Sequence, residues 1–446
     1  MSALRKKSIP MYVIKKRSIG LDISDRTIEV VELTDEGDKM RVTSTGRVTL
    51  EGRVVERGRI KDTEQLERSI SQAFEQATPH SISERKVVFG LPESQVYTHV
   101  FELWPHEKET RDELVLKEAQ TSIPLKEDDI LFSYSVLWEE EGKVEILLVA
   151  ISKTVFLEWR NFFYGIKLEV LKYDSEMLAT FRGLFAKRPK GAVCVVDIGA
   201  RTSSIAIFNS RGMRYSHTLE VAGEAMDEEI ARALKITQAR AEEIKIKIGL
   251  SDKRERVFFV LIKILEQIAE SVRSSLEYFK ERTGEGVDRV FLVGESSKLK
   301  GIDKYFSDEL GIPAWIGESA LLRNVASLEF IEAIGLAIRG LDDSWEETDP
   351  IFYVKPAPTR DSREKKGDEQ ETDDKNGKED IVLATPVELR QIRKLQFEKK
   401  VLLGILVLGV GLVFTAALYR DYRREKFFKE LQRAQLERQA IHQGGF

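Results

Sequence analysis

Apolar and polar positions alternate along the chain in two blocks that follow the same order. In residues 18–50 the alternation predicts three strands, and the first two form a hairpin joined by Asp25 and Arg26. Residues 191–221 repeat this order, and in both blocks the first strand ends in an aspartate and a tight turn. A repeat at this distance indicates an internal duplication rather than a short-period array.

Amphipathic helices are expected around both blocks. Residues 62–77 place Leu66 and Phe74 on one face, and residues 257–281 carry apolar side chains at the same helical spacing. Between the blocks, strands and helices over about 86–171 follow a different order, which predicts an inserted small α+β subdomain. We therefore expect an α/β fold of two similar halves with this insertion.

Composition excludes several classes of protein. The chain has 446 residues, of which 42% are hydrophobic, so more than one packed unit is expected. A formal net charge of −5 leaves no broad basic field to displace phosphate counterions, which argues against nucleic-acid binding. The single cysteine, Cys194, lies in a predicted strand and allows no intrachain disulfide, as is usual in the cytosol.

The C-terminal region differs from the rest of the chain. Residues 341–380 are poor in apolar side chains and rich in charge, which predicts a disordered linker. Residues 401–419 form an uncharged apolar run that is long enough for one transmembrane helix. The basic N-terminal segment, residues 1–17, lacks the apolar core of a secretion signal. We expect residues 18–340 to lie in the cytosol and residues 420–446 to form a short helical tail across the membrane.

The two strand-end turns carry the candidate chemistry. Each has an aspartate, an apolar residue, a glycine or serine, and then a threonine, so backbone N–H groups and hydroxyls could bind phosphate oxygens. The aspartates, Asp22 and Asp197, are suited to hold Mg²⁺ against those phosphates. One such turn is also common without any ligand, but two facing copies would clamp a nucleotide from both sides.

Several segments together resemble a known family. The order "GLDISDRTIEVVEL", "VVDIGARTSSIAIF", "VAGEAMDEEIARAL" and "RVFLVGESSKLKGIDKYFSDELGIP" resembles the actin-like ATP-binding superfamily, and most closely the PilM family of type IV pilus assembly proteins. The inserted stretch, which includes "KEAQTSIPLKEDDILFSYSVL", resembles the subdomain that PilM shares with the cell-division protein FtsA. The resemblance implies an actin-like duplicated fold with ATP and Mg²⁺ as ligands. The phosphate turns alone would also fit sugar kinases or chaperone ATPases.

The resemblance assigns nucleotide-binding roles residue by residue, and three positions depart from the family pattern. Ser24 and Glu295 replace glycines, and Glu29 stands where relatives often carry lysine. Asp22 and Asp197 would be the metal ligands. The implied nucleotide site consists of Asp22, Ser24, Asp25, Arg26 and Thr27 in the first phosphate turn, Asp197, Gly199, Arg201, Thr202 and Ser203 in the second, Gly223 beside them, Glu242 and Lys245 facing ribose and base, and Gly294, Ser296 and Ser297 in the adenosine turn.

The departures leave two functions open. In the first, ATP and Mg²⁺ bind mainly as a structural or conformational ligand, with weak or no hydrolysis. In the second, the chain is a degenerate, nucleotide-free scaffold that keeps the fold for its protein contacts. A metabolic kinase is a third interpretation, although no catalytic base or substrate pocket is recognisable and no residue is assigned a catalytic role.

The resemblance also implies partners at the inner membrane, where PilM is held by the cytoplasmic tail of the single-span protein PilN. Within residues 381–400, Ile381, Leu383 and Pro386 match that tail in kind, so the chain resembles a PilM head fused to a PilN-like segment. Chance apolar residues in a linker are the alternative. The expected partners are PilN-like and PilO-like proteins, the pilus motor ATPase and a second copy of the chain. An L-type component of type II secretion is the second family interpretation, and pilus assembly, secretion and DNA uptake stay open.

Overall fold

The computed structural model describes residues 16–352, except residues 38, 105–109, 186, 253–254, 320 and 323–326. Within this part of the chain, no helix is long and apolar enough to cross a membrane. Several predictions fall on residues outside it and stay predictions: they concern the basic segment before residue 16, the linker after residue 352, the PilN-like tail at 381–400, the transmembrane helix at 401–419 and the tail at 420–446.

Lobe 1 is built on a five-stranded sheet with the order β10-β6-β1-β2-β3. β1 (Lys16–Ile23), β2 (Thr27–Asp35) and β3 (Met40–Thr49) form an antiparallel meander. β6 (Lys86–Leu91) pairs in parallel with β1, and β10 (Glu169–Ser175) pairs in parallel with β6. The hairpin that the sequence predicts between the first two strands is confirmed.

Lobe 2 repeats this plan with the order β13-β12-β11-β14-β15. β11 (Ala192–Ile198), β12 (Ser203–Asn209) and β13 (Gly212–Leu219) form the meander. β14 (Val287–Val293) pairs in parallel with β11, and β15 (Ala314–Ile316) pairs in parallel with β14. Each strand therefore has a counterpart in lobe 1 with the same order and direction, which confirms the predicted duplication.

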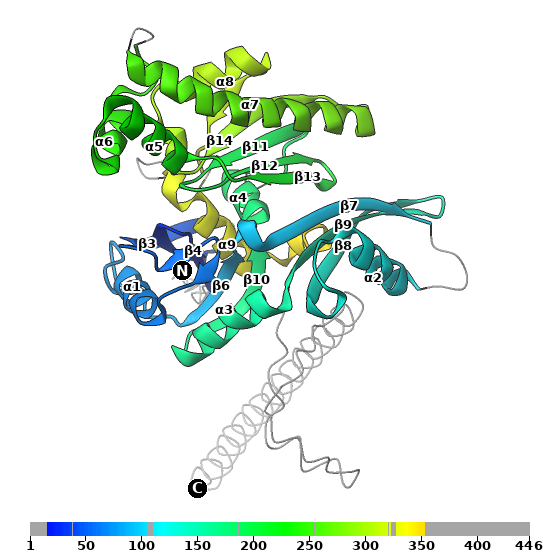
Figure 1. Ribbon diagram of the computed structural model, residues 1–446. Helices are drawn as coiled ribbons and strands as arrows, with labels where there is room; N and C mark the ends of the chain where they lie inside the picture. Colours follow the sequence, from blue (N-terminus) through cyan, green and yellow to red (C-terminus); the bar gives the residue numbers. More distant parts are fainter. Residues whose placement is uncertain are drawn as a thin grey trace, which may run out of the picture. The chain divides into compact units, whose positions relative to one another are not determined.

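Two helices, α4 (Glu176–Phe185) and α9 (Ile331–Leu341), lie between the two sheets (Figure 1). Their backbones approach closely, because a Cβ at Gly335 would lie only 1.7 Å from the carbonyl oxygen of Ala179. Phe181 of α4 stacks on a phenylalanine of β12, with 4.0 Å between the ring centroids. The absence of a side chain at Gly335 therefore allows the two helices to pack in direct backbone contact. Helix α4 also packs against the sheet of lobe 2.

The other long helices of the two lobes lie around the outside of the sheets (Figure 1). The helices that the sequence predicts at 62–77 and 257–281 are confirmed, with ends that differ by at most two residues. Asp62 caps the first of them by accepting a hydrogen bond from the backbone N–H of Gln65. These outer helices are α1 (Thr63–Glu75), α3 (Lys153–Gly165), α5 (Gly223–Leu234), α6 (Gln238–Ile248), α7 (Arg256–Thr283) and α8 (Ile302–Leu310).

A small subdomain with its own apolar core is inserted into lobe 1, with strand order β7-β9-β8. It is shorter than the expected stretch of 86–171, because β6 and β10 belong to the sheet of lobe 1. Helix α3 also belongs to lobe 1, where it buries Trp159 against Phe89. The inserted elements are β7 (Val96–Leu103), α2 (Arg111–Ser122), β8 (Ile130–Glu140) and β9 (Lys143–Ser152).

Residues 343–352, here called the C-terminal strap, pack against lobe 1. Phe352 is buried and exchanges two backbone hydrogen bonds of 3.1 Å with Tyr173 of β10. Trp345 is buried as well. The expectation of a disordered linker over 341–380 is therefore wrong for residues 341–352, because these apolar side chains find partners on the folded lobe.

Candidate nucleotide-binding cleft

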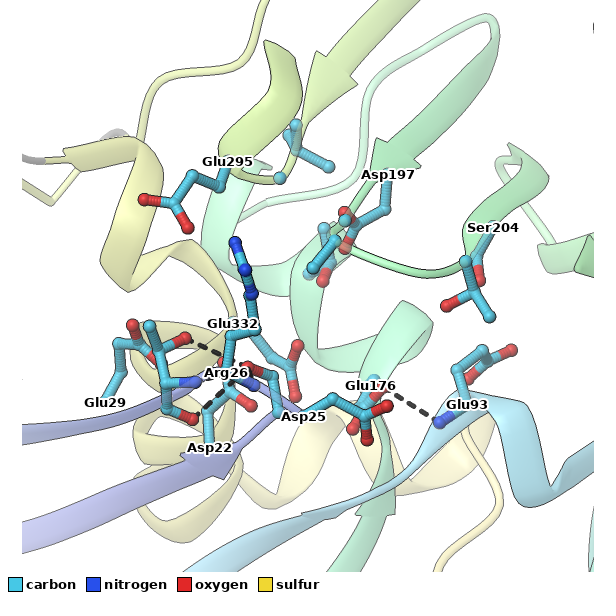
Figure 2. A pocket seen from close by; sticks show the side chains of 18 of the residues that line it. Asp22, Asp25, Arg26, Glu29, Glu93, Glu176, Asp197, Ser204, Glu295 and Glu332 are labelled. Carbon is cyan, nitrogen blue, oxygen red and sulfur yellow. Dashed lines mark hydrogen bonds between the residues drawn. The ribbon is translucent and has the colours of Figure 1, made fainter. Parts of the chain in front are cut away.

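Two turns face each other across a cleft between the lobes. The first follows β1 at residues 22–27, and the second follows β11 at residues 197–203. Figure 2 shows that their acidic and basic side chains point toward one space, and the cleft encloses about 180 Å³. The predicted nucleotide-binding residues that line this cleft are Asp22, Ser24, Asp25, Arg26, Thr27, Asp197, Gly199, Arg201, Thr202 and Gly294.

Both turns are closed by the same backbone hydrogen bond. The N–H of Ser24 donates to the carbonyl of Thr27 at 2.9 Å, and the N–H of Gly199 donates to the carbonyl of Thr202 at 3.0 Å. The Ser24 hydroxyl also accepts a hydrogen bond of 3.0 Å from the N–H of Thr27. Ser24, which replaces the expected glycine, therefore stabilises the turn. Its hydroxyl also takes up the N–H of Thr27, which would otherwise be free to bind a phosphate.

On the predicted adenosine side, Lys245 and Ser296 are engaged in contacts within the chain. Lys245 is buried and donates to Oδ2 of Asp227 at 2.8 Å. The Ser296 hydroxyl donates to a backbone carbonyl of the second turn at 2.8 Å. Ser203 points away from the cleft and Ser204 lines it instead, because neighbouring strand residues face opposite sides. The predicted residues outside the cleft lining are Ser203, Gly223, Glu242, Lys245, Ser296 and Ser297.

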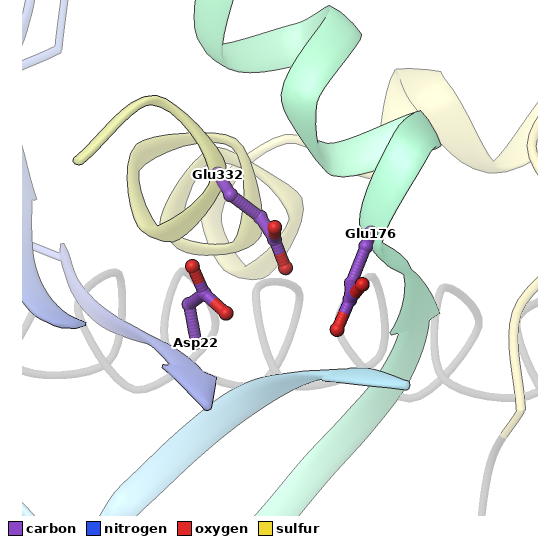
Figure 3. Close-up of side chains that lie close together, drawn as sticks. All are labelled: Asp22, Glu176 and Glu332. Carbon is purple, nitrogen blue, oxygen red and sulfur yellow. The ribbon is translucent and has the colours of Figure 1, made fainter. Parts of the chain in front are cut away.

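Three carboxylates meet on the floor of the cleft (Figure 3). Asp22 is at the end of β1, Glu176 begins α4, and Glu332 lies in the first turn of α9. One oxygen atom from each lies within 4.8 Å of the others. Burial, followed by the charges of neighbouring carboxylates, raises the pKa of all three well above the usual range. Each is therefore hard to ionise unless a cation compensates the charge.

Of the two predicted metal ligands, Asp22 belongs to this cluster of three carboxylates and Asp197 does not. Asp197 lines the same cleft, and its charge raises the pKa of Asp22, but it is not one of the three clustered carboxylates. Burial raises the pKa of Asp197 itself to about 6. Sequence reasoning missed Glu176 and Glu332, whose only signal is that each is an acid at the start of an apolar stretch, which the structure shows to be helical.

Arg47 places a positive charge beside Glu29 and Glu295, two of the three positions that depart from the family pattern. Its Nε lies 2.7 Å from Glu29 and its Nη2 lies 3.1 Å from Glu295. Burial still raises the pKa of Glu29 to about 7, although the hydrogen bond and charge of Arg47 act in the opposite direction. Arg47 stands directly opposite Glu29 in the β2–β3 register, so a correct strand alignment would have found it.

The residues present fit a divalent cation together with phosphate better than phosphate alone. Carboxylate oxygens are the ligands that Mg²⁺ prefers, and Oε1 of Glu332 is buried and has no hydrogen-bond partner among the described residues. Arg26 and Arg201, the expected phosphate ligands, already form ion pairs with carboxylates of the chain. A bare triphosphate would therefore add negative charge to a cleft that is already acidic.

Comparison with known proteins decides the family. A family model described as type IV pilus assembly protein PilM matches residues 20–340, well over half of the chain. The chain belongs to the PilM family. A solved structure titled "PilM-PilN type IV pilus biogenesis complex" aligns with a TM-score of 0.63 and 21% identity, over 73% of this chain and 98% of that chain. The predicted actin-like α/β fold is thereby confirmed.

Curated relatives match shorter parts of this PilM-family chain. The cell division protein FtsA of Pseudomonas aeruginosa is 34% identical over 108 residues, which are 24% of this chain and 25% of FtsA. The cell shape-determining protein Mbl of Bacillus subtilis is 28% identical over 190 residues, 35% of this chain and 57% of Mbl. The chain thus spans less than two thirds of the length of either relative.

The cleft makes the stability of this PilM-family protein depend on pH. Burial raises the pKa of Glu93 from 4.5 to about 7, and Glu93 accepts hydrogen bonds from Ser175 in lobe 1 and Ser216 in lobe 2. Because the folded state holds a proton that the unfolded state releases, the free energy of unfolding falls as pH rises from about 4.5 to 7. Urea unfolding at pH 5 and pH 8 should show wild type losing about 3 kcal/mol more than Glu93→Gln.

Glu309→Gln is the matched control, because Glu309 lies on the surface of α8, and it should follow the wild-type pH dependence. At pH 5 the Glu93→Gln variant should be close to wild type, since both side chains are then neutral. Equal losses of stability for wild type and Glu93→Gln between the two pH values would contradict the assignment.

Proposed function

We propose that residues 16–352 of this PilM-family chain, here called the head, bind ATP with Mg²⁺ as a conformational ligand within a type IV pilus assembly platform. The observation that carries the proposal is the pair of identically closed turns, which face one cleft from the two lobes. Bound nucleotide would touch both lobes and stabilise one arrangement of them.

Asp22, Glu176 and Glu332 are the residues that would hold the cation. Mg²⁺ would neutralise charge between these carboxylates and the phosphates, which the acidic cleft otherwise repels. The N–H of Glu93 donates to Glu176 Oε2 at 2.8 Å and fixes the orientation of that carboxylate. Binding should therefore require the cation and the nucleotide together.

Weak or absent hydrolysis follows from the same carboxylates. A general base must be ionised to accept a proton from the attacking water. Burial raises the pKa of Glu176 well above its usual range and that of Glu93 to about 7, so Glu176 favours its protonated form near neutral pH and Glu93 is ionised only in part. A metal-bound state would lower the pKa of Glu176 but would also commit its oxygen to the cation.

A nucleotide-free scaffold is the second candidate function. It is favoured by the ion pair between Lys245 and buried Asp227, which engages a residue predicted to face the nucleotide. It is favoured as well by the ion pairs that occupy Arg26 and Arg201. In this case the lobes would be held by the chain's own contacts, and ligand would change nothing.

Thermal unfolding of the head with and without Mg·ATP separates the two candidates. A ligand that binds only the folded state adds a stabilisation that grows with the logarithm of its free concentration, about 2.7 kcal/mol at a hundredfold excess over Kd, and this raises the unfolding midpoint. We expect Mg·ATP to raise the midpoint, whereas ATP with EDTA should not, and phosphate release should stay near the no-protein rate. An unchanged midpoint at millimolar Mg·ATP would favour the scaffold.

The membrane and partner assignments are further parts of the proposal. A PilN-like partner is supported by the solved complex, whose title names PilM with PilN. The segment with Ile381, Leu383 and Pro386 would be the tail that docks on the head of the same or a neighbouring copy, and residues 401–419 would anchor it in the inner membrane. PilO-like proteins and the motor ATPase would be neighbours of the chain in this platform.

A photocrosslinker placed at Leu383 should label the head. Labels that appear only on lipid or on unrelated proteins would contradict docking.

A further inference from the structure

One carboxylate beside the cleft, that of Glu224, pairs with both of the arginines that were expected to bind phosphate. Oε1 of Glu224 lies 3.4 Å from Nε of Arg26, which belongs to the first turn. Oε2 of Glu224 lies 3.0 Å from Nε of Arg201, which belongs to the second turn. Glu224 itself sits in the first turn of α5, where the helix N-terminus favours an anion.

The Nη1 atom of each arginine is also paired. Nη1 of Arg201 donates to Asp25 at 2.8 Å, and Nη1 of Arg26 donates to Glu242 at 3.1 Å. Asp25 also accepts the backbone N–H groups of Arg57 and Gly58, at 2.8 and 3.2 Å. Arg26 and Asp25 belong to lobe 1, whereas Arg201, Glu224 and Glu242 belong to lobe 2, so these ion pairs join the two lobes across the cleft.

We propose that Glu224 is a built-in competitor of the nucleotide phosphates. Its carboxylate offers the arginines the two-oxygen face that a phosphate would offer, and it keeps the lobes together when no nucleotide is bound. Nucleotide must displace Glu224 from Arg26 and Arg201 before it can bridge the two turns. Glu224 thus raises the nucleotide concentration at which the head responds. The inference rests on the proposed function, because competition presupposes that the cleft accepts ATP.

The exposure of these side chains is what permits exchange. The side chains of Arg26, Arg201 and Glu224 are 38%, 24% and 22% exposed, so water can solvate them when the pairs separate. The buried pair of Lys245 and Asp227, with side chains 10% and 2% exposed, has no such freedom. The Glu224 pairs are therefore the contacts that a ligand can replace.

Equilibrium binding of a fluorescent ATP analogue with Mg²⁺ tests the inference in Glu224→Gln. The amide keeps the size of the side chain but loses the charge that competes with phosphate, so the Kd should fall about tenfold. The matched control is Glu220→Gln. Glu220 also forms an ion pair between the lobes, with Arg57, but contacts neither Arg26 nor Arg201, so its Kd should equal that of wild type.

Glu242→Gln is the second variant, which releases only Nη1 of Arg26 and should lower the Kd by about two- to threefold. Circular dichroism shows whether each variant is folded. Measurable binding with the same Kd in wild type, Glu224→Gln and Glu242→Gln would overturn the competitor role and leave the proposed function intact. No binding in wild type and in folded Glu224→Gln would overturn both.

Discussion

Asp174→Ala should destabilise the chain by about 3–5 kcal/mol, because it leaves two buried arginines without their shared counter-charge. Asp174, Arg182 and Arg339 are each 0% exposed. Asp174 Oδ2 forms the ion pair with Arg182 and lies 3.7 Å from Nε of Arg339. Arg182 also donates to Asp349 at 2.6 Å, so the cluster attaches the C-terminal strap to α4. Chemical unfolding monitored by circular dichroism measures the loss.

The control for this prediction is Asp308→Ala on the exposed surface of α8, which should change the free energy of unfolding by less than about 0.5 kcal/mol. Asp349→Ala should have a smaller effect than Asp174→Ala, because Arg182 then keeps Asp174. An Asp174→Ala protein as stable as the Asp308→Ala control would show that the buried cluster does not stabilise the fold.

Asp197→Ala should weaken binding of Mg·ATP by about 10- to 100-fold, the usual cost of removing a group that supports a bound metal. Asp197 lies near the end of β11 and lines the cleft, and its pKa of about 6 leaves it ionised at pH 7.5. Asp197→Asn keeps the shape and loses the charge, so it should be weakened nearly as much. Titration of the labelled analogue measures both, with Asp308→Ala as the control.

A normal Kd in Asp197→Ala would contradict the place of this carboxylate in the site. A parallel loss of fold, seen by circular dichroism, would instead assign it a structural role. Circular dichroism is needed here because Asp197 packs closely against the predicted adenosine turn. The contact is so close that a Cβ added at Gly294 would lie 2.1 Å from Oδ1 of Asp197.

The duplication and the two strand-end turns could be predicted because they are local in sequence. Alternating apolar residues predicted each strand, and an aspartate at the strand end marked each turn. The structure shows that Ser24 and Gly199 close their turns through the same hydrogen bond. Ser24, which stands where the family pattern has glycine, is therefore compatible with the shape of the first turn.

The acidic floor and the ion pairs across the cleft could not be predicted in this way. Glu176 and Glu332 are far apart in sequence and meet only because α4 and α9 cross at Gly335. Ser203 was assigned to the cleft, but strand alternation gives that place to Ser204. The sequence has no local signal for such contacts, since they depend on how the two lobes pack.

The most direct test of the account is equilibrium binding of a labelled ATP analogue to the wild-type head, with excess Mg²⁺ and with EDTA. The acidic floor of Asp22, Glu176 and Glu332 predicts saturable binding with Mg²⁺ and little or none with EDTA. Unlabelled ATP should displace the analogue. No detectable binding at millimolar Mg·ATP, or equal binding with and without the cation, would contradict the account.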